Sequence, residues 1–156
     1  MKLVVQRVSN ASVTVDGEIT GKIQKGLMVL VGFGLNDSEK EVDYLVNKLL
    51  KLRIFPDDNN RMNLSVMDIN GELLLVPQFT LYGSTKKNRP SFHKALAPDD
   101  ATILFDYMVN KCSESIHVET GVFGAFMDVN LLNSGPVTIL LEKEYSWKNT
   151  FISFFF

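Results

Sequence analysis

Few residues in this chain of 156 belong to the types that usually carry catalysis. Cys112 is the only cysteine, which excludes an internal disulfide and a thiolate zinc cluster. The two histidines, His93 and His117, are too far apart for the helical His pair of a metalloprotease. A Ser-His-acid triad built from distant residues stays open, but there is no Gly-x-Ser-x-Gly element to support one. We therefore expect no metal and no other cofactor.

Two segments place polar or rigid residues where an apolar strand would otherwise continue. Gln78-Phe79-Thr80-Leu81 follows the apolar run Leu73–Val76, and Pro77 between them removes a backbone donor, which indicates a sheet edge or a bend. Asn133-Ser134-Gly135-Pro136 is predicted to be a turn between two strands, and its Gly-Pro bond is ordinarily trans but can be cis. Taken alone, Thr80 is typical of a strand, because β-branched side chains favour strands.

The charged residues give weaker signals. Lys86-Lys87-Asn88-Arg89 is a short basic cluster in a polar loop, typical either of a solvated loop or of a contact with a phosphate backbone. The pairs Asp57-Asp58 and Asp99-Asp100 fall in a predicted turn and at a predicted helix start, where Asp is favoured for structural reasons. With 16 basic and 18 acidic residues the net charge is −2, which argues against a wide basic face and predicts no DNA partner.

No apolar run approaches the roughly 20 residues that are needed to span a bilayer. We therefore expect no membrane contact and a cytoplasmic location.

The first half of the chain is rich in strand signals. Apolar residues alternate with Ser and Thr from Ala11 to Val15, and Asp16-Gly17 then predicts a tight hairpin. The continuous apolar run Leu27–Val31 predicts a strand that is covered on both faces. Asn70-Gly71 predicts a second hairpin that leads into a strand at 72–76.

Two helices are expected. The first begins at Ser38, because Glu41 three residues later completes a capping box. Its buried face should carry Val42, Leu45, Val46 and Leu49. The second opens at Asp99, where a negative charge suits the helix N-terminus. Its buried face should carry Ile103, Leu104, Tyr107 and Met108.

The order of elements, with two last strands at 127–131 and 137–141, predicts an α/β fold. We expect mixed, layered β-sheets with two main helices packed on one side. Length and composition fit one domain, residues 1–145. Residues 146–156 form a Phe-rich tail of unknown role.

Several blocks together make the chain resemble the D-aminoacyl-tRNA (D-tyrosyl-tRNA) deacylase family, from Val4 to about Leu141. The matching blocks are Gln6-Arg7-Val8, Ala11-Ser12-Val13, Gly26–Gly32, Lys51–Phe55, Met62–Ser65, Gln78–Leu81, Arg89–Phe92, Gly121–Ala125 and Asn133–Thr138. No single block is specific for this family, but the combination of all these blocks in the same order is.

The resemblance implies the fold of that family, a homodimer, and hydrolysis of the ester that joins a D-amino acid or glycine to the terminal adenosine of a tRNA. It implies that Gln78, Phe79 and Thr80 line the reaction centre. It also implies that Gly135 and Pro136 form a cis pair that reaches into the neighbouring subunit's site and that Arg7 holds this pair. We further expect the substrate to contact Asn133, Phe123, Lys86 and Lys87.

This activity fits the residues, because an aminoacyl ester is already activated and its own ribose hydroxyl can help to activate water. The protein then has to place the ester and stabilise the oxyanion, for which backbone N–H groups around Phe79 and Thr80 are suited. Whether Thr80 acts by its hydroxyl or its amide stays open, and we favour the amide, since no base lies beside it in the motif. The carbonyl oxygens of Gly135-Pro136 would exclude an L side chain from the pocket.

Pro77 departs from the family, which usually has Ser at this point, and it resembles an animal tRNA deacylase that accepts some L-alanyl-tRNA. Two alternatives therefore stay open. One is a relaxed deacylase that clears misacylated L-alanyl-tRNA, and the other is a non-catalytic module that binds the tRNA acceptor end.

Overall fold

The structure is a computed structural model that describes residues 1–145, so the predicted aromatic tail lies outside the described residues. The strands are β1 (Lys2–Val15), β2 (Glu18–Ile23), β3 (Gly26–Gly32), β4 (Phe55–Pro56), β5 (Met62–Leu64), β6 (Glu72–Pro77), β7 (His117–Thr120) and β8 (Asp128–Glu142). The helices are α1 (Glu39–Lys51) and α2 (Pro98–Ser113), and a 3-10 turn, η1, covers Phe79–Tyr82.

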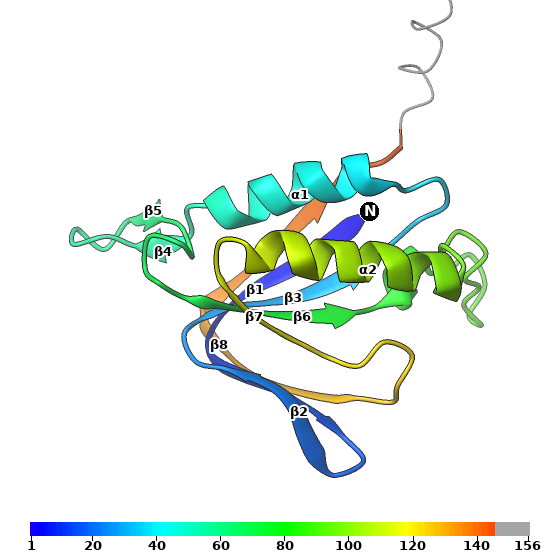
Figure 1. The fold of residues 1–156 in the computed structure, drawn as a ribbon, viewed down its shortest axis with the longest axis horizontal. Coiled ribbons are helices and arrows are strands. Elements are labelled where there is room, and N and C mark those ends of the chain that lie inside the picture. The colour runs from blue at the N-terminus through cyan, green and yellow to red at the C-terminus, as the bar shows by residue number, and fades with distance from the viewer. Residues whose placement is uncertain (146–156) are drawn as a thin grey trace, which may run out of the picture.

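One mixed sheet dominates the fold. Its strand order is β2-β1-β3-β6-β7, and β8 pairs with β1 as well. The strand β1 is antiparallel to β2, β3 and β8, whereas β6 is parallel to both β3 and β7. Both helices cover the same face of the sheet (Figure 1). The α/β fold with two helices on one side is therefore confirmed.

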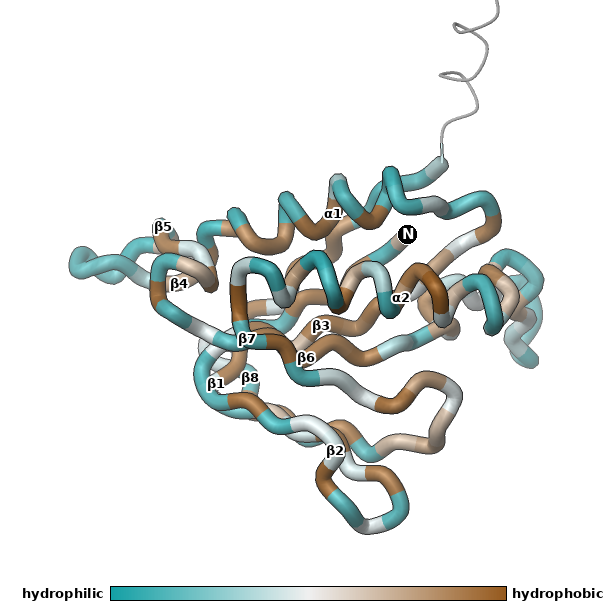
Figure 2. Tube along the Cα trace, in the orientation of Figure 1, coloured by the Kyte–Doolittle hydropathy of each residue, from teal (hydrophilic) through white to brown (hydrophobic). Residues whose placement is uncertain are grey.

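The first helix forms as the sequence predicts. Ser38 is its N-cap, and its backbone N–H donates to Glu41 Oε2 at 2.7 Å, which is one half of the capping box. The predicted apolar positions of α1 are all buried. In Figure 2 they form the hydrophobic stripe of the helix that faces the sheet.

The second helix begins at Pro98, with Asp99 and Asp100 in its first turn. Its buried residues are Ala101, Leu104, Phe105, Met108 and Cys112. The prediction that Ile103 is buried is wrong, because its side chain is 65% exposed. Ile103 lies two residues beyond Ala101, about 200° around a helix of 3.6 residues per turn, and therefore on the opposite face.

Two predicted turns also differ from the structure. Asn70-Gly71 does not close a hairpin, because β6 pairs in parallel with β3 (Leu27 opposite Leu73) and α1 supplies the crossover between them. Residues 133–136 do not separate two strands. They lie within the single strand β8, which stays beside β1 from Asp128 to Glu142 and absorbs the extra residues as a bulge.

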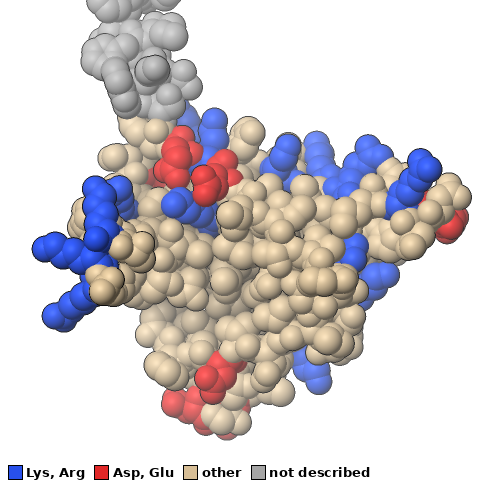
Figure 3. All heavy atoms as spheres, turned by 180° about the vertical axis from the view of Figure 1, so that it is seen from behind, with Lys and Arg blue, Asp and Glu red and all other residues tan. Residues whose placement is uncertain are grey.

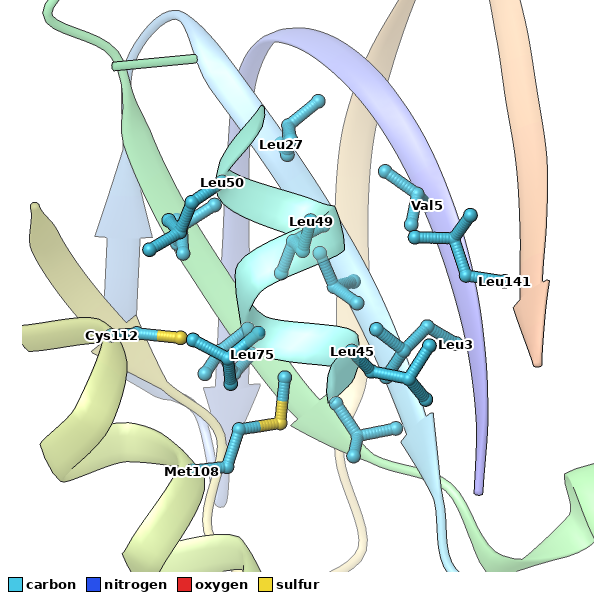
Figure 4. Close-up of a cluster of buried hydrophobic side chains, with 14 of the residues drawn as sticks. Leu3, Val5, Leu27, Leu45, Leu49, Leu50, Leu75, Met108, Cys112 and Leu141 are labelled. Atoms are coloured by element: carbon cyan, nitrogen blue, oxygen red, sulfur yellow. The ribbon is translucent and has the colours of Figure 1, made fainter. Parts of the chain in front are cut away.

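The main hydrophobic core lies between the helices and the sheet. Figure 4 shows side chains of α1, α2 and the strands meeting there, among them Leu3, Leu49, Leu75 and Met108, each at most 1% exposed. Cys112 is part of this core, and burial raises the pKa of its thiol to about 12. The thiol therefore stays protonated and is no candidate nucleophile.

Neighbouring residues of α2 offer a matched test of this packing. Leu104→Ala should lower the free energy of unfolding by about 2–5 kcal/mol, because it leaves a cavity in the core. Ile103→Ala, the control on the solvent face, should change it by less than about 0.5 kcal/mol. Urea unfolding of both variants measures the difference, and equal losses would contradict the assigned orientation of α2.

Candidate active site

A pocket with a volume of about 710 Å³ opens at the carboxyl end of β6. In open α/β sheets this is the end at which ligands usually bind. The walls come from the ends of β3 and β6, the loop before α2, the start of α2, and the segment between β7 and β8 together with the start of β8. Their residues are mostly apolar: Val31, Phe33, Val76, Pro77, Gln78, Phe79, Phe92, Ala95, Leu96, Ala97, Pro98, Ala101, Phe123, Gly124, Ala125, Phe126, Met127 and Val129.

The chain turns sharply where β6 reaches this pocket. The Gln78 N–H donates to the carbonyl of Val31 at 2.7 Å, and the 3-10 turn η1 follows directly. This turn packs closely on β3, since a Cβ on Gly32 would lie 2.9 Å from Leu81 Cβ and 3.0 Å from the Gln78 carbonyl oxygen. Glycine at position 32 therefore lets the polar segment sit against the sheet.

The turn exposes Phe79 and Thr80 beside the pocket. The ring of Phe79 packs edge to face on Phe92, with 5.0 Å between the centroids. The side-chain amide of Gln78 donates to Thr80 Oγ1.

The first backbone N–H groups of this short turn have no carbonyl three residues earlier within the turn to bond. Within residues 1–145, neither the N–H of Phe79 nor that of Thr80 has a hydrogen-bond acceptor. Two neighbouring donors at the edge of an apolar pocket are therefore left without an acceptor in the described part of the chain. Such donors can stabilise negative charge that develops on a bound oxygen.

A second group of predicted residues gathers around the bulge in β8. Arg7 donates from Nε to the Ser134 carbonyl at 2.9 Å and from Nη1 to the Ile54 carbonyl at 2.6 Å. Asn133 Oδ1 accepts the N–H of Val137 at 2.8 Å. The arginine thus ties the bulge to Ile54, the residue before β4.

The Gly135-Pro136 bond in this bulge is cis, and both residues are exposed. Gly135 has a φ of +132°, and a Cβ there would lie 2.7 Å from Arg7 Nη2. The backbone conformation therefore favours glycine at this position, and an added Cβ would displace the guanidinium that holds the bulge.

The structure thus divides the predicted site residues into two clusters. Gln78, Phe79 and Phe123 line the pocket, with Thr80 at its edge. Arg7, Asn133, Gly135 and Pro136 lie together at the bulge, and none of them lines the pocket as it is formed by the described residues.

Lys86 and Lys87 belong to neither cluster. They lie with Arg89 in the exposed loop between η1 and α2. Seen from behind, this loop forms the basic projection at the left edge of Figure 3. It joins the pocket through Phe92, Ala95 and Leu96, which are wall residues.

Most of the apolar wall was not predicted. Phe33, Leu96 and Ala101 have no chemical signature and are recognisable only once the loop and α2 are placed beside β6. Phe92 was foreseeable, since it ends the Arg89–Phe92 block. Phe126, at the rim, is 92% exposed, and no pattern in the sequence marks it.

Neither histidine lines this pocket. Ser91 Oγ lies 3.2 Å from His93 Nδ1 on the exposed loop, whereas His117 Nε2 lies 3.5 Å from Glu72 Oε2 on β6. Among residues 1–145, no three or more His, Cys, Asp or Glu side chains are arranged to hold a metal ion. No helix in the same residues is long and apolar enough to cross a membrane.

The family model for D-Tyr-tRNA(Tyr) deacylase matches residues 4–142 of the chain. Two similar proteins are both named D-aminoacyl-tRNA deacylase. The one from Thermosipho melanesiensis is 53% identical over 147 residues, covering 92% of this chain and 98% of its own. The one from Kosmotoga olearia is 56% identical over 144 residues, covering 92% and 97%.

Two solved structures are also similar. One, described as "c-Myc DNA Unwinding Element Binding Protein", has a TM-score of 0.89 and 42% sequence identity, covering 93% of this chain and 100% of its own. The other, described as "Structural Analysis of a probable eukaryotic D-amino acid tRNA deacylase", has a TM-score of 0.80 and covers 90% and 97%. Its identity is 18%, so it supports the fold alone.

The two hydrogen bonds of Arg7 generate a prediction about the bulge. Arg7→Met keeps an apolar stem but removes both donors, and should lower the free energy of unfolding by at least about 1.5–3 kcal/mol, the range for one bond to a charged group. Arg89→Met, in the exposed loop, is the matched control and should change it by less than about 0.5 kcal/mol. Equal effects in chemical denaturation would show that Arg7 does not hold the bulge.

Proposed function

Because this chain belongs to the D-Tyr-tRNA(Tyr) deacylase family, we propose that its pocket at the end of β6 hydrolyses the ester between a D-amino acid and the terminal adenosine of tRNA. Water adds to the ester carbonyl, and the products are the free D-amino acid and the tRNA. Glycine, which has no side chain to exclude, is a second substrate in this proposal. We place the reaction in the cytoplasm, where charged tRNA is used.

The observation that carries this assignment is that the N–H groups of Phe79 and Thr80, beside the pocket, have no acceptor within residues 1–145. An aminoacyl ester needs little activation, so holding it still and stabilising its oxyanion account for most of the catalysis. The neighbouring ribose hydroxyl of the substrate assists the water. Because the substrate hydroxyl activates the water and the protein only positions the ester and stabilises the oxyanion, this mechanism needs no histidine, cysteine or metal from the protein.

The hydrogen bond between Gln78 and Thr80 supports a separate role for each side chain in this proposal. The Gln78 amide occupies a lone pair of Thr80 Oγ1, which leaves the hydroxyl hydrogen free to point at the substrate. We assign the oxyanion mainly to the two backbone N–H groups. Gln78 and the Thr80 hydroxyl then orient the substrate around them.

Chiral selection in this proposal depends on a homodimer. The bulge at Gly135-Pro136 is exposed and lies outside the pocket of its own protomer. On the same strand Leu132 is 57% exposed and Leu140 is 66% exposed. A second copy packed on this strand would cover these side chains and bring one protomer's bulge to the other's pocket.

In such a dimer the carbonyl oxygens of Gly135 and Pro136 stand where an L side chain would have to lie. An L-aminoacyl ester would then meet a clash and leave polar atoms unpaired, whereas a D side chain points away. Exclusion of this kind discriminates more strongly than a favourable contact with one hydrogen atom. Asn133, which bonds the backbone of Val137, helps to keep the bulge in shape.

The exposed loop supplies the contact with the acceptor end. Lys86, Lys87 and Arg89 are close in sequence to Phe92 in the pocket wall, so a bound phosphate backbone would lead the terminal nucleotide toward the pocket. Three basic side chains fit a short flexible end better than a duplex, and we therefore propose tRNA and not DNA as the partner. Binding without turnover, the non-catalytic alternative, would leave the free N–H pair unused.

The direct test compares tRNA charged with D-tyrosine, L-tyrosine, D-alanine and L-alanine. The D esters should be released at least about 100-fold faster than the L esters, since a clash with unpaired acceptors costs a few kcal/mol. Similar rates for D- and L-tyrosine would overturn chiral exclusion, and tight binding without release would favour the non-catalytic alternative.

The comparison of L-alanyl-tRNA with D-alanyl-tRNA tests the effect of Pro77, which lines the pocket. If L-alanyl-tRNA is cleared as fast as D-alanyl-tRNA, the relaxed deacylase is the correct assignment. Pro77→Ser should then restore the discrimination.

A pair of variants at position 80 separates the amide from the hydroxyl. Thr80→Ala keeps the N–H and should lower kcat by less than about tenfold, whereas Thr80→Pro removes it and should lower kcat by about 100-fold or more, as for loss of one oxyanion donor. Far-UV circular dichroism and urea unfolding show whether each variant is folded. Complete inactivity of Thr80→Ala with intact tRNA binding would assign the hydroxyl the main role.

A further inference from the structure

Tyr82 is the buried end of η1, the turn that carries the two N–H groups beside the pocket. Of the four residues of η1, all of them within the described range, Tyr82 alone is buried, with 8% of its surface exposed. Phe79 and Thr80 belong to the same turn but are exposed. A 3-10 turn this short has too few hydrogen bonds of its own to fix its orientation. The direction in which its N–H groups point therefore depends on what holds Tyr82.

The ring of Tyr82 contacts two other segments of the chain. A Cβ on Gly34 would lie 2.5 Å from Tyr82 Cε1 and 2.7 Å from Tyr82 Cζ, so the ring rests directly on the backbone of this glycine. Lys2 Nζ lies 4.8 Å from the centroid of the ring, as in a cation–π contact. Gly34 in turn forms an antiparallel bridge with Ala95, which lines the pocket. Tyr82 thus joins η1 to one wall of the pocket.

The hydroxyl of Tyr82 binds a carboxylate from beyond the last strand. It donates to Glu144 Oε1 at 3.3 Å, and Glu144 lies two residues after the end of β8. Burial raises the pKa of Tyr82, and the charges of Asp37 and Glu144 raise it further, so the hydroxyl stays protonated and can donate at neutral pH. A hydrogen bond to a charged acceptor is stronger than a neutral one. Glu144 therefore holds the far end of the side chain that anchors η1.

We propose that Tyr82 and Glu144 are positioning residues, whose hydrogen bond fixes η1 so that the N–H groups of Phe79 and Thr80 face the bound ester. This inference rests on the proposed function, which gives these N–H groups their task. Neither Tyr82 nor Glu144 lines the pocket as the described residues form it, so both act through η1. Loss of their bond should lower kcat more than it raises KM, because misplaced donors stabilise the transition state less while the apolar walls that bind the substrate stay in place.

Replacement of each partner tests the proposal through kcat for D-tyrosyl-tRNA. Tyr82→Phe keeps the ring but removes the donor, and should lower kcat by about tenfold while KM changes by less than about twofold. Glu144→Ala should have the same effect, whereas Glu144→Gln, which keeps an acceptor, should retain most of the activity. The double variant Tyr82→Phe/Glu144→Ala should lower kcat no more than the larger single change, because both break one bond. Multiplied losses, or a larger change in KM than in kcat, would overturn the proposal.

Tyr107 provides a matched control on the helices. Its hydroxyl donates to Asp43 Oδ1 at 2.7 Å, and Lys111 Nζ lies 5.8 Å from the centroid of its ring, so its contacts resemble those of Tyr82. None of these three residues lines the pocket as the described part of the chain forms it. Tyr107→Phe should therefore leave kcat and KM unchanged, whatever it does to the free energy of unfolding. An equal fall in kcat for Tyr107→Phe and Tyr82→Phe would indicate a general loss of stability and overturn the proposal.

Amide hydrogen exchange tests the anchoring of η1 without any substrate. The N–H groups of Leu81 and Gly83 close the turn by donating to carbonyls three residues earlier, at 3.3 Å and 3.0 Å. Tyr82→Phe should speed exchange of both amides by about tenfold or more, because the turn opens more often, and Tyr107→Phe should not. Unchanged exchange in Tyr82→Phe would overturn the proposal. Failure of the unaltered chain to release a D-amino acid would instead overturn the proposed function, and the exchange rates would still decide whether Tyr82 holds η1.

Discussion

The structure depends above all on the pairing of β1 with three other strands. Its first half pairs with β3, its second half with β2, and β8 runs beside nearly all of it. Met1, the residue before this strand, pairs with Asp37, and Arg7 within the strand holds the bulge in β8. A change in the register of β1 would turn its side chains to the other face of the sheet and displace both contacts at once.

The pocket follows from the part of the sheet that is parallel. Because β6 runs parallel to β3 with α1 as the crossover, the polar segment after β6 emerges at the edge where the loop before α2 also passes. The sharp turn into η1 then leaves the N–H groups of Phe79 and Thr80 without acceptors among residues 1–145, at a place where the surrounding walls are apolar. Unpaired donors usually destabilise a fold, and an exposed edge beside a pocket lets water satisfy them until a substrate replaces it.

The separation of the two clusters gives the proposed dimer its physical rationale. The described chain has an apolar pocket with two N–H groups beside it, whereas the bulge that we propose selects against L-amino acids is held elsewhere by Arg7. In a site shared between two copies, the pocket that binds the ester and the bulge that excludes L side chains could be built on different parts of the sheet. Neither would then have to be distorted to reach the other.

The sequence by itself determined the local features, which depend on neighbours along the chain. The capping box at Ser38, the buried stripe of α1 and the hairpin at Asp16-Gly17 follow from backbone chemistry within a few residues. The family blocks likewise identified Gln78–Leu81 and Asn133–Thr138 as the segments of interest. Only the tertiary structure decided that β6 pairs in parallel, that Ile103 faces solvent and that Met1 is buried against Asp37. These outcomes rest on contacts between residues far apart in the chain, and no local propensity or spacing records which distant partner covers a given side chain.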